Sequence, residues 1–322
     1  MSQLSVEKSM QPSLPQTKKK KSGLMRFLKQ WDLQLMVIPA LALVFVFSYI
    51  PMYGILISFQ DYKIGSSFTS SPWVGFKHFN YFFNSPEFGV VMRNTIVISF
   101  LKFLIGFPAP IMLALMLNEV RNMAFKRTVQ TVTYLPYFMS WVIVGGLVSS
   151  LLSVDSGAIN MLLERFNLIS QPINFLSLPE YFWGILITTN VWKEIGFGSI
   201  VYLAAIAGVD PHTYEAASID GASRFKQIYL ITLPSIMPVV TIFMILAIGN
   251  LLSAGFEDIL ILAADKSLRD VSDVIDTYVV RVGIENYRYS FATAVGLFKA
   301  VVSVGLLTLA NLIARRSGNS LW

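Results

Sequence analysis

The sequence predicts an all-α membrane protein with six transmembrane helices. Of its 322 residues, 54% are hydrophobic and only 14% are charged, with a mean hydropathy of +0.60. Six apolar stretches are each long enough to supply the ~20 residues that a helix needs to cross ~30 Å of hydrocarbon. The basic residues gather in the N-terminal tail and in alternate loops. A lipid bilayer is therefore the expected solvent of most of the chain.

The first 32 residues are expected to form a basic cytoplasmic tail. They are polar and carry the run from Lys18 to Lys21, followed by Arg26 and Lys29. No small-residue cleavage signature follows the first apolar stretch, so we expect an uncleaved span and not a secretory signal. The lysine run favours a solvated tail that sets orientation, and binding to anionic lipid is the alternative.

Residues 33–322 are expected to form one membrane domain. Its spans are predicted at about 35–58, 94–117, 130–152, 182–206, 234–256 and 290–313. An even number of spans places both termini on one side of the membrane. The loops on that side hold 14 Lys and Arg residues against 7 on the other side, so both ends are predicted to be cytoplasmic.

The outer loops are acidic. They carry 12 Asp and Glu residues, seven of them between Glu257 and Glu285. This surface would suit docking of another protein, although solubility alone would also explain it. Glu257 and Asp258 end the fifth span, where a solvated helix end is favoured over a gate.

Several classes of function are excluded by composition. The absence of cysteine rules out disulfides and thiolate chemistry, and His78 and His212 are too few and too far apart for a histidine-based zinc site. The basic charge follows membrane topology and does not form a nucleic-acid surface. No G-x-x-x-x-G-K-[ST] loop occurs, so the chain is not expected to be an enzyme that hydrolyses ATP.

The cytoplasmic loop 208–233 is predicted to be a helix, a glycine and a second helix. Asp210 is a good N-cap with Pro211 at the first helical position, and Gly221 can take the left-handed conformation that ends the helix. An amphipathic segment then runs into the membrane at Pro234.

The spacing of this loop resembles the EAA loop of binding-protein-dependent ABC importer permeases, with Glu215-Ala-Ala, then Gly221, then Leu233-Pro234. The resemblance implies that the first helix is a coupling helix, which seats in a groove of a separate ATPase. The alternative is an ordinary interfacial amphipathic helix. The predicted coupling residues are Glu215, Ala216, Ala217, Asp220, Gly221, Ile231, Leu233 and Pro234.

Further segments resemble the carbohydrate-uptake, maltose-type branch of that family. They are Trp73-Val-Gly-Phe-Lys-His-Phe, Arg93-Asn-Thr and Tyr134-Leu-Pro. The segments from Asp273 to Gly283 and from Tyr289 to Lys299, with Leu321-Trp322, resemble oligosaccharide and polysaccharide permeases of Gram-positive bacteria, such as rhamnogalacturonan importers.

This resemblance implies a type I importer permease fold and a set of partners. It implies a second homologous permease, an ABC ATPase dimer, an extracellular solute-binding protein and an oligosaccharide substrate, in the plasma membrane of a bacterium. Transport would proceed by alternating access. No cofactor is expected in this chain, and ATP and Mg²⁺ would bind the partner ATPase.

Ionisable side chains within spans are candidates for the substrate pathway. Each costs ~2.5–3.5 kcal/mol to insert, so it is expected to face a cavity or a partner. Lys193 lies near the middle of the fourth span beside Trp192 and Glu194, with Lys102 and Lys299 in other spans. Neighbouring helical residues point apart, so Lys193 and Glu194 are each expected to need a partner of their own. A lysine can bind a carboxylate, and a tryptophan can stack on the C–H faces of a sugar. A cavity with both would suit an acidic oligosaccharide, such as one that contains galacturonate.

Blander interpretations of these residues remain open. The alternatives are that Lys102 and Lys299 snorkel toward the outer interface and that Lys193 is neutralised by a buried carboxylate. Asn190 and Asn250 suit sugar hydroxyls or contacts between helices. Rival functions are import of neutral sugars or glycerol phosphate, or ion-coupled secondary transport. An intramembrane enzyme is disfavoured, because no paired catalytic aspartates lie within spans.

Overall fold

The computed structural model describes residues 30–67, 69–316, 318 and 320–322. Residues 1–29 of the expected cytoplasmic tail therefore lie outside the described residues. Over the described ranges the chain is helical, with one isolated β-bridge between Gln60 and Trp73. It divides into two compact units, Met1–Gly54 and Ile55–Trp322.

The described part of unit 1 consists of helical turns that continue into one another. They are α2 (Trp31–Val44), the π-helical turn η1 (Phe45–Tyr49) and α3 (Ile50–Met52), followed across the boundary by the 3-10 segment η2 (Tyr53–Phe59). Together they make one apolar helical stretch of 29 residues, long enough to cross a membrane.

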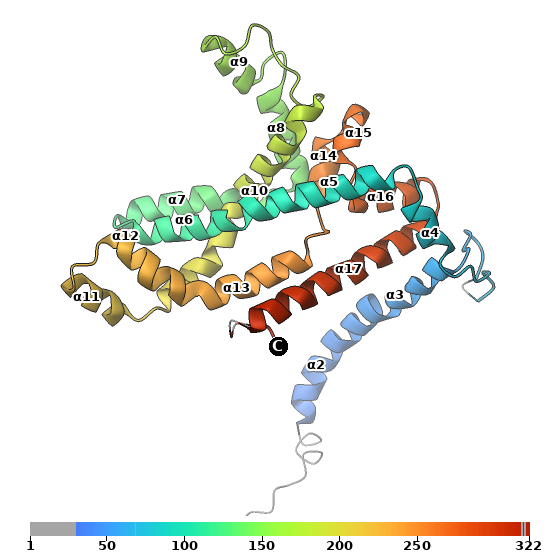
Figure 1. The fold of residues 1–322 in the computed structure, drawn as a ribbon, viewed down its shortest axis with the longest axis horizontal. Helices are drawn as coiled ribbons and strands as arrows, with labels where there is room; N and C mark the ends of the chain where they lie inside the picture. Colours follow the sequence, from blue (N-terminus) through green and yellow to red (C-terminus); the bar gives the residue numbers. More distant parts are fainter. Residues whose placement is uncertain (1–29, 68, 317, 319) are drawn as a thin grey trace, which may run out of the picture. The chain divides into compact units, whose positions relative to one another are not determined.

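Unit 2 holds the remaining helices (Figure 1). Its first half contains α4 (Lys77–Phe83), α5 (Phe88–Leu101), η3 (Lys102–Gly106), α6 (Pro108–Glu119), α7 (Met123–Tyr134), η4 (Leu135–Phe138), α8 (Trp141–Leu152), α9 (Ala158–Arg165) and α10 (Pro179–Ala207). Its second half contains α11 (Pro211–Ile219), α12 (Arg224–Gln227), η5 (Ile228–Thr232), α13 (Leu233–Gly249), α14 (Glu257–Leu262), η6 (Lys266–Leu268), α15 (Arg269–Ser272), α16 (Ile275–Val280), η7 (Arg281–Glu285) and α17 (Tyr289–Arg315).

The described residues supply four continuous helices that are apolar and long enough to span a membrane, and up to six spans if two bent helix pairs count as one each. The continuous helices are Trp31–Phe59, Phe88–Glu119, Arg224–Gly249 and Tyr289–Arg315. The bent pairs are Met123–Phe138 with Trp141–Leu152, and Pro179–Ala207 with Pro211–Ile219.

The third expected span, 130–152, differs most from a straight helix. The chain turns by 108° between η4 and α8, where Met139 and Ser140 are extended. Pro136 has no N–H to continue the ladder, and the Ser140 hydroxyl accepts a hydrogen bond from the Ile143 N–H (3.4 Å) and starts a new helix. Hydropathy detects the apolar run but not this break.

The fifth expected span, 234–256, also differs in extent. Its helix begins at Arg224, well before Pro234, and ends at Gly249. Residues 250–255 then form turns and an irregular segment. Asn250 consequently lies at the end of the helix and not inside it.

Packing in unit 2 centres on α10, which lies against α6 and α7, while α13 packs along α17. At Gly196 of α10, a Cβ atom would lie 2.0 Å from the backbone oxygen of Thr133 in α7. Only glycine permits so close an approach of the two backbones. In Figure 1, α11 lies at one end of unit 2, whereas α4 and α16 lie at the opposite end.

Candidate functional site

The predicted helix–glycine–helix loop is present. The Asp210 carboxylate accepts a hydrogen bond from the His212 N–H (3.0 Å), with Pro211 as the first residue of α11. Gly221 ends the helix with φ of +75°, while its N–H donates to the Ser218 carbonyl (3.1 Å). These bonds satisfy backbone groups that a helix end otherwise leaves open, so local sequence alone fixes the shape of the loop.

Helix α11 is attached to the start of the fifth span. The Tyr214 hydroxyl lies 2.9 Å from the Thr232 hydroxyl, and the Gln227 amide donates to the Ser218 hydroxyl (3.0 Å). Arg224 in α12 approaches Glu119 at the end of α6 (3.5 Å). Side-chain contacts as well as the chain itself therefore connect α11 to the helical turns that lead into α13.

The outward surface of α11 has no cover within the described chain. The side chains of Glu215, Ala216 and Asp220 are exposed, and Ile219 is 87% exposed. The Glu215 carboxylate contacts only the exposed His212 ring in its own helix, at 3.3 Å. This surface of α11 therefore presents both acidic side chains and one large apolar side chain to its surroundings.

The other predicted coupling residues lie on the span and not on α11. Ile231 belongs to the π-helical turn η5, and Leu233 and Pro234 open α13. Ile231 and Leu233 are half-buried, and Leu233 packs against the core cluster of α6, α10 and α13. The motif thus combines an exposed helix with the joint that attaches it to the membrane.

Lys193 is buried at the bend between η4 and α8. Its Nζ donates to the Tyr137 carbonyl (2.9 Å) and lies 5.2 Å and 5.4 Å from the ring centres of Tyr137 and Trp141. The half-exposed Glu194 carboxylate is more distant, at 3.9 Å. Lys193 thus satisfies a carbonyl that the broken helix leaves open. Its neighbour Trp192 is exposed and Asn190 is half-buried.

Lys102 pairs with Asp258, which has a side chain only 5% exposed, and Lys102 also donates to the Ala254 carbonyl (2.6 Å). The expectation that Asp258 is a solvated helix end is therefore wrong, because a lysine from another span neutralises it. Lys102 and Asn250 line one cavity of about 220 Å³, together with Ser99 and Ser253. Glu194 lies within electrostatic range of Lys102 and Asp258.

Lys299 lies apart from that cavity and pairs with Asp276 of α16. A third pair joins Arg281 to Asp273. Residues 257–285 are called the outer segment below. Three of its seven acidic residues thus pair with cations of the same chain. Outward snorkelling therefore does not describe Lys102 or Lys299. The exposed part of this segment is therefore less acidic than its sequence indicates.

Sequence reasoning did not identify the anchor of this outer segment. The Asn94 amide donates to the carbonyls of Asp270 and Asp273 (both 3.1 Å), and the Thr95 hydroxyl accepts from the Ile275 N–H (2.9 Å). The signal was available as the polar run Arg93-Asn-Thr in the second span. These residues hold the outer segment against α5.

Tyr278 of α16 is a buried residue of the outer segment. Burial, reinforced by the Glu87 carboxylate, raises the pKa of Tyr278 to about 12. The hydroxyl therefore stays protonated and donates to Glu87 (3.3 Å).

Within the described ranges, no group of three or more His, Cys, Asp or Glu side chains is arranged to hold a metal ion.

Comparison with known proteins gives consistent results. Residues 106–321 match the model of the binding-protein-dependent transport system inner membrane component family. The chain is 45% identical over 300 residues to the polygalacturonan/rhamnogalacturonan transport system permease protein YteP of Bacillus subtilis, covering 93% of this chain and 92% of that protein. It is 44% identical over 284 residues to LplB of Bacillus subtilis, covering 88% of each.

Solved structures agree with the expected fold. A bacterial ABC transporter involved in import of the acidic polysaccharide alginate contains a chain with a TM-score of 0.84 and 41% identity, covering 91% of this chain and 98% of that one. A bacterial alginate ABC transporter in complex with an alginate pentasaccharide-bound periplasmic protein gives a TM-score of 0.85 at 39% identity, covering 93% and 99%. The all-α type I importer fold is thereby confirmed. The chain belongs to the binding-protein-dependent transport system inner membrane component family and is a multi-pass ABC importer permease, a transport component and not a catalytic one.

Proposed function

We propose that this permease imports acidic oligosaccharides, such as pectin-derived rhamnogalacturonan fragments, into a bacterial cell. The observation that carries the proposal is the agreement of two relatives over more than nine-tenths of the chain, one of polygalacturonan/rhamnogalacturonan transport and one of alginate import. Both cargoes are acidic polymers of sugars. Family membership in a binding-protein-dependent system sets the ion-coupled alternative aside.

The proposed assembly supplies what the chain lacks. A second homologous permease would complete the path, an ABC ATPase dimer would bind ATP and Mg²⁺, and an extracellular solute-binding protein would deliver the cargo. The exposed surface of α11, with Glu215 and Ile219, supports docking to the ATPase. The attachment of α11 to α13 supports transfer of that motion to the spans. With α11 at the ATPase, both termini would be cytoplasmic.

The cavity of Lys102 and Asn250 is the proposed segment of the sugar path in this subunit. It combines amide and hydroxyl groups, which suit the hydroxyls of a sugar, with a lysine that Asp258 already neutralises. Lys299 pairs with Asp276, and Lys193 donates to the Tyr137 carbonyl at the bend before α8. Contact of these two lysines with the cargo therefore has less support than contact at the cavity of Lys102 and Asn250. A Lys193→Ala variant that assembles normally and retains full uptake would remove Lys193 from the path.

The proposal is tested by uptake in proteoliposomes holding the complete transporter with its solute-binding protein. Labelled trigalacturonate is compared with its neutral, carboxyl-reduced counterpart. We expect ATP-dependent uptake of the acidic sugar at a rate at least ~10-fold above that of the neutral one, because paired recognition of a carboxylate is lost in the latter. Equal rates, or uptake of the neutral sugar alone, would support the neutral-sugar alternative.

A further inference from the structure

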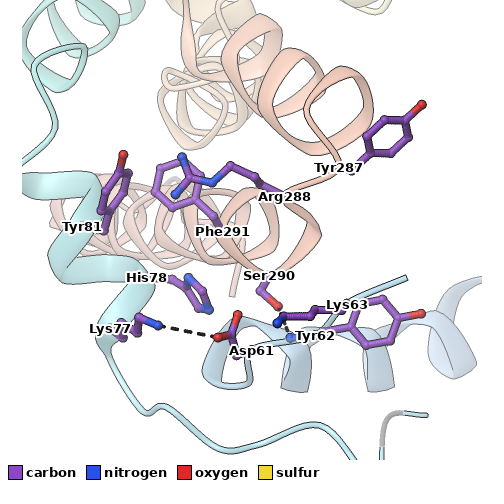
Figure 2. A pocket seen from close by; sticks show the side chains of 10 residues that line it. All are labelled: Asp61, Tyr62, Lys63, Lys77, His78, Tyr81, Tyr287, Arg288, Ser290 and Phe291. Atoms are coloured by element: carbon purple, nitrogen blue, oxygen red, sulfur yellow. Dashed lines mark hydrogen bonds and ion pairs between the residues drawn. The ribbon is translucent and has the colours of Figure 1, made fainter. Parts of the chain in front are cut away.

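A second cavity lies at the end of unit 2 remote from α11. It is formed by the segment after η2, helix α4 and the start of α17, and Figure 2 shows its lining side chains. Its volume of about 280 Å³ is close to the lower end of the ~300–1,000 Å³ range of small-molecule sites. Its lining includes Lys63, Lys77, Arg288, Tyr62, Tyr81 and Tyr287.

The cavity carries uncompensated positive charge. Lys63, Lys77 and Arg288 line it with a single carboxylate, Asp61, which lies 3.6 Å from Lys77. Over the described residues, neither Lys63 nor Arg288 forms an ion pair. Lys102, Lys193 and Lys299, in contrast, each form an ion pair with an acidic side chain. An anion entering this cavity would therefore meet cations that no acidic group of the described chain neutralises.

Arg288 is held in place by its surroundings. Its guanidinium carbon lies 4.5 Å from the ring centre of Tyr81 and 4.6 Å from that of Phe291. Figure 2 shows the guanidinium near both rings. Rings against the guanidinium contribute cation–π attraction and leave N–H groups at its edge available to a ligand. The cavity wall is fixed as well, because the Ser290 hydroxyl accepts the Tyr62 N–H at 2.9 Å. A fixed guanidinium loses little freedom on binding a carboxylate.

Tyr287 adds an independent observation. Its φ is +57°, in the left-handed region that a bulky side chain rarely adopts. It lies where the chain leaves η7, with the Arg288 N–H donating to the Val282 carbonyl at 3.1 Å. Glycine is the usual residue at such a helix end, and Gly221 fills the equivalent position after α11. Strain of this kind gathers at functional sites, and here it presents a 65% exposed ring at the cavity margin.

We propose that this cavity binds one carboxylate-bearing sugar residue, of the uronate class, at the outer mouth of the permease. Arg288 donates to the carboxylate, Lys63 supplies further positive charge, and the Tyr287 ring covers an apolar face of the sugar. The cavity would hold an acidic chain at the mouth as it passes from the solute-binding protein to the spans. This inference rests on the proposed function, because it assumes that the cargo is acidic.

The test measures binding of trigalacturonate to the complete transporter in nanodiscs without the solute-binding protein. We expect the neutral methyl ester of trigalacturonate to bind at least ~10-fold more weakly, and Arg288→Gln to raise the Kd for trigalacturonate by about 10-fold. Added salt should weaken the wild-type interaction because the cavity is exposed. The matched control is Arg269→Gln, which alters an exposed arginine of the outer segment that has no ion pair within the described chain.

Tyr287→Gly separates function from folding. Glycine accepts the left-handed φ, so the variant should unfold no more readily than the wild type while its Kd for trigalacturonate rises several-fold. A Kd unchanged in both Arg288→Gln and Tyr287→Gly would overturn the inference. So would variants that lose affinity for the solute-binding protein alone, since the cavity would then receive an acidic side chain of that protein.

The inference and the proposed function fail separately. If the transporter imports trigalacturonate but the cavity variants bind it as the wild type does, the cavity assignment is wrong and the acidic cargo stands. If the transporter imports only neutral sugars, the acidic cargo is wrong and the cavity assignment falls with it.

Discussion

The two ends of unit 2 use charge in opposite ways. In the loop of α11, Glu215 and Asp220 are exposed and have few contacts within the chain. In the outer segment 257–285, Asp258, Asp273 and Asp276 are turned inward to cations. Acidic residues in the sequence therefore have different roles in the two regions. The α11 end leaves its acidic side chains exposed, while the segment 257–285 uses three of its own to fix an irregular stretch against the spans.

The largest effect should come from breaking a buried outer pair. Asp258→Asn leaves the Lys102 ammonium without a counter-charge in a site where both side chains are mostly buried. We expect a loss of about 3 kcal/mol in the free energy of unfolding, measured by thermal or denaturant unfolding in detergent. Asp155→Asn is the control, since Asp155 is exposed on an outer loop and has no ion pair in the described chain.

The same pair can be removed whole. Lys102→Met with Asp258→Leu should recover most of the stability lost in Asp258→Asn, because no unpaired charge remains. If Asp258→Asn were as stable as Asp155→Asn, the contrast between the two ends would fail.

Charge reversal at the inner end should act on transport and not on folding. Glu215→Lys changes an exposed side chain, so the unfolding midpoint should stay within the scatter of surface substitutions. ATP-driven uptake should fall about 10-fold, equivalent to ~1.4 kcal/mol of lost interaction with a partner. Glu164→Lys, an equally exposed reversal on α9, should leave uptake unchanged. Full uptake in Glu215→Lys would contradict the assignment of α11 as the coupling helix.

The turn after α11 gives a smaller expected effect. Gly221→Ala forces a Cβ into a left-handed conformation with φ of +75°, which costs roughly 1 kcal/mol. Hydrogen exchange should show faster opening of α11 while the spans remain protected. Gly146→Ala is the comparison, because its Cβ would meet nothing within 4 Å. Equal protection of α11 in both variants would mean that the turn does not hold the helix.

The smallest effect concerns Asp265, an exposed cap of η6. Hydrogen bonds from the Ser267 N–H and hydroxyl lower the pKa of this carboxyl below its usual 3.8. Its contribution to stability is therefore fully present above that value and is lost as the pH falls through the lower folded pKa. Asp265→Asn should reduce the change in unfolding midpoint between about pH 5 and pH 2 relative to wild type. An identical pH profile in both proteins would show that the cap contributes nothing.

Local features could be predicted from the sequence, and long-range pairings could not. Asp210, Pro211 and Gly221 fix α11 through contacts within a few residues, so capping rules suffice. The partner of Lys102 lies 156 residues away, and nothing in hydropathy selects Asp258 among the outer carboxylates. Hydropathy does not reveal the bend at Met139 either, because the apolar composition of the chain continues through it.

The close approach of Gly196 to Thr133 has a mechanical consequence. With no side chain between them, α7 and α10 cannot roll over one another and should travel as one rigid body. Force applied to α11 enters this body through the short connection 208–210. It leaves where the chain turns by 108° before α8, a joint whose open carbonyl at Tyr137 is held by Lys193. That lysine is thus placed to set the resting angle of the joint.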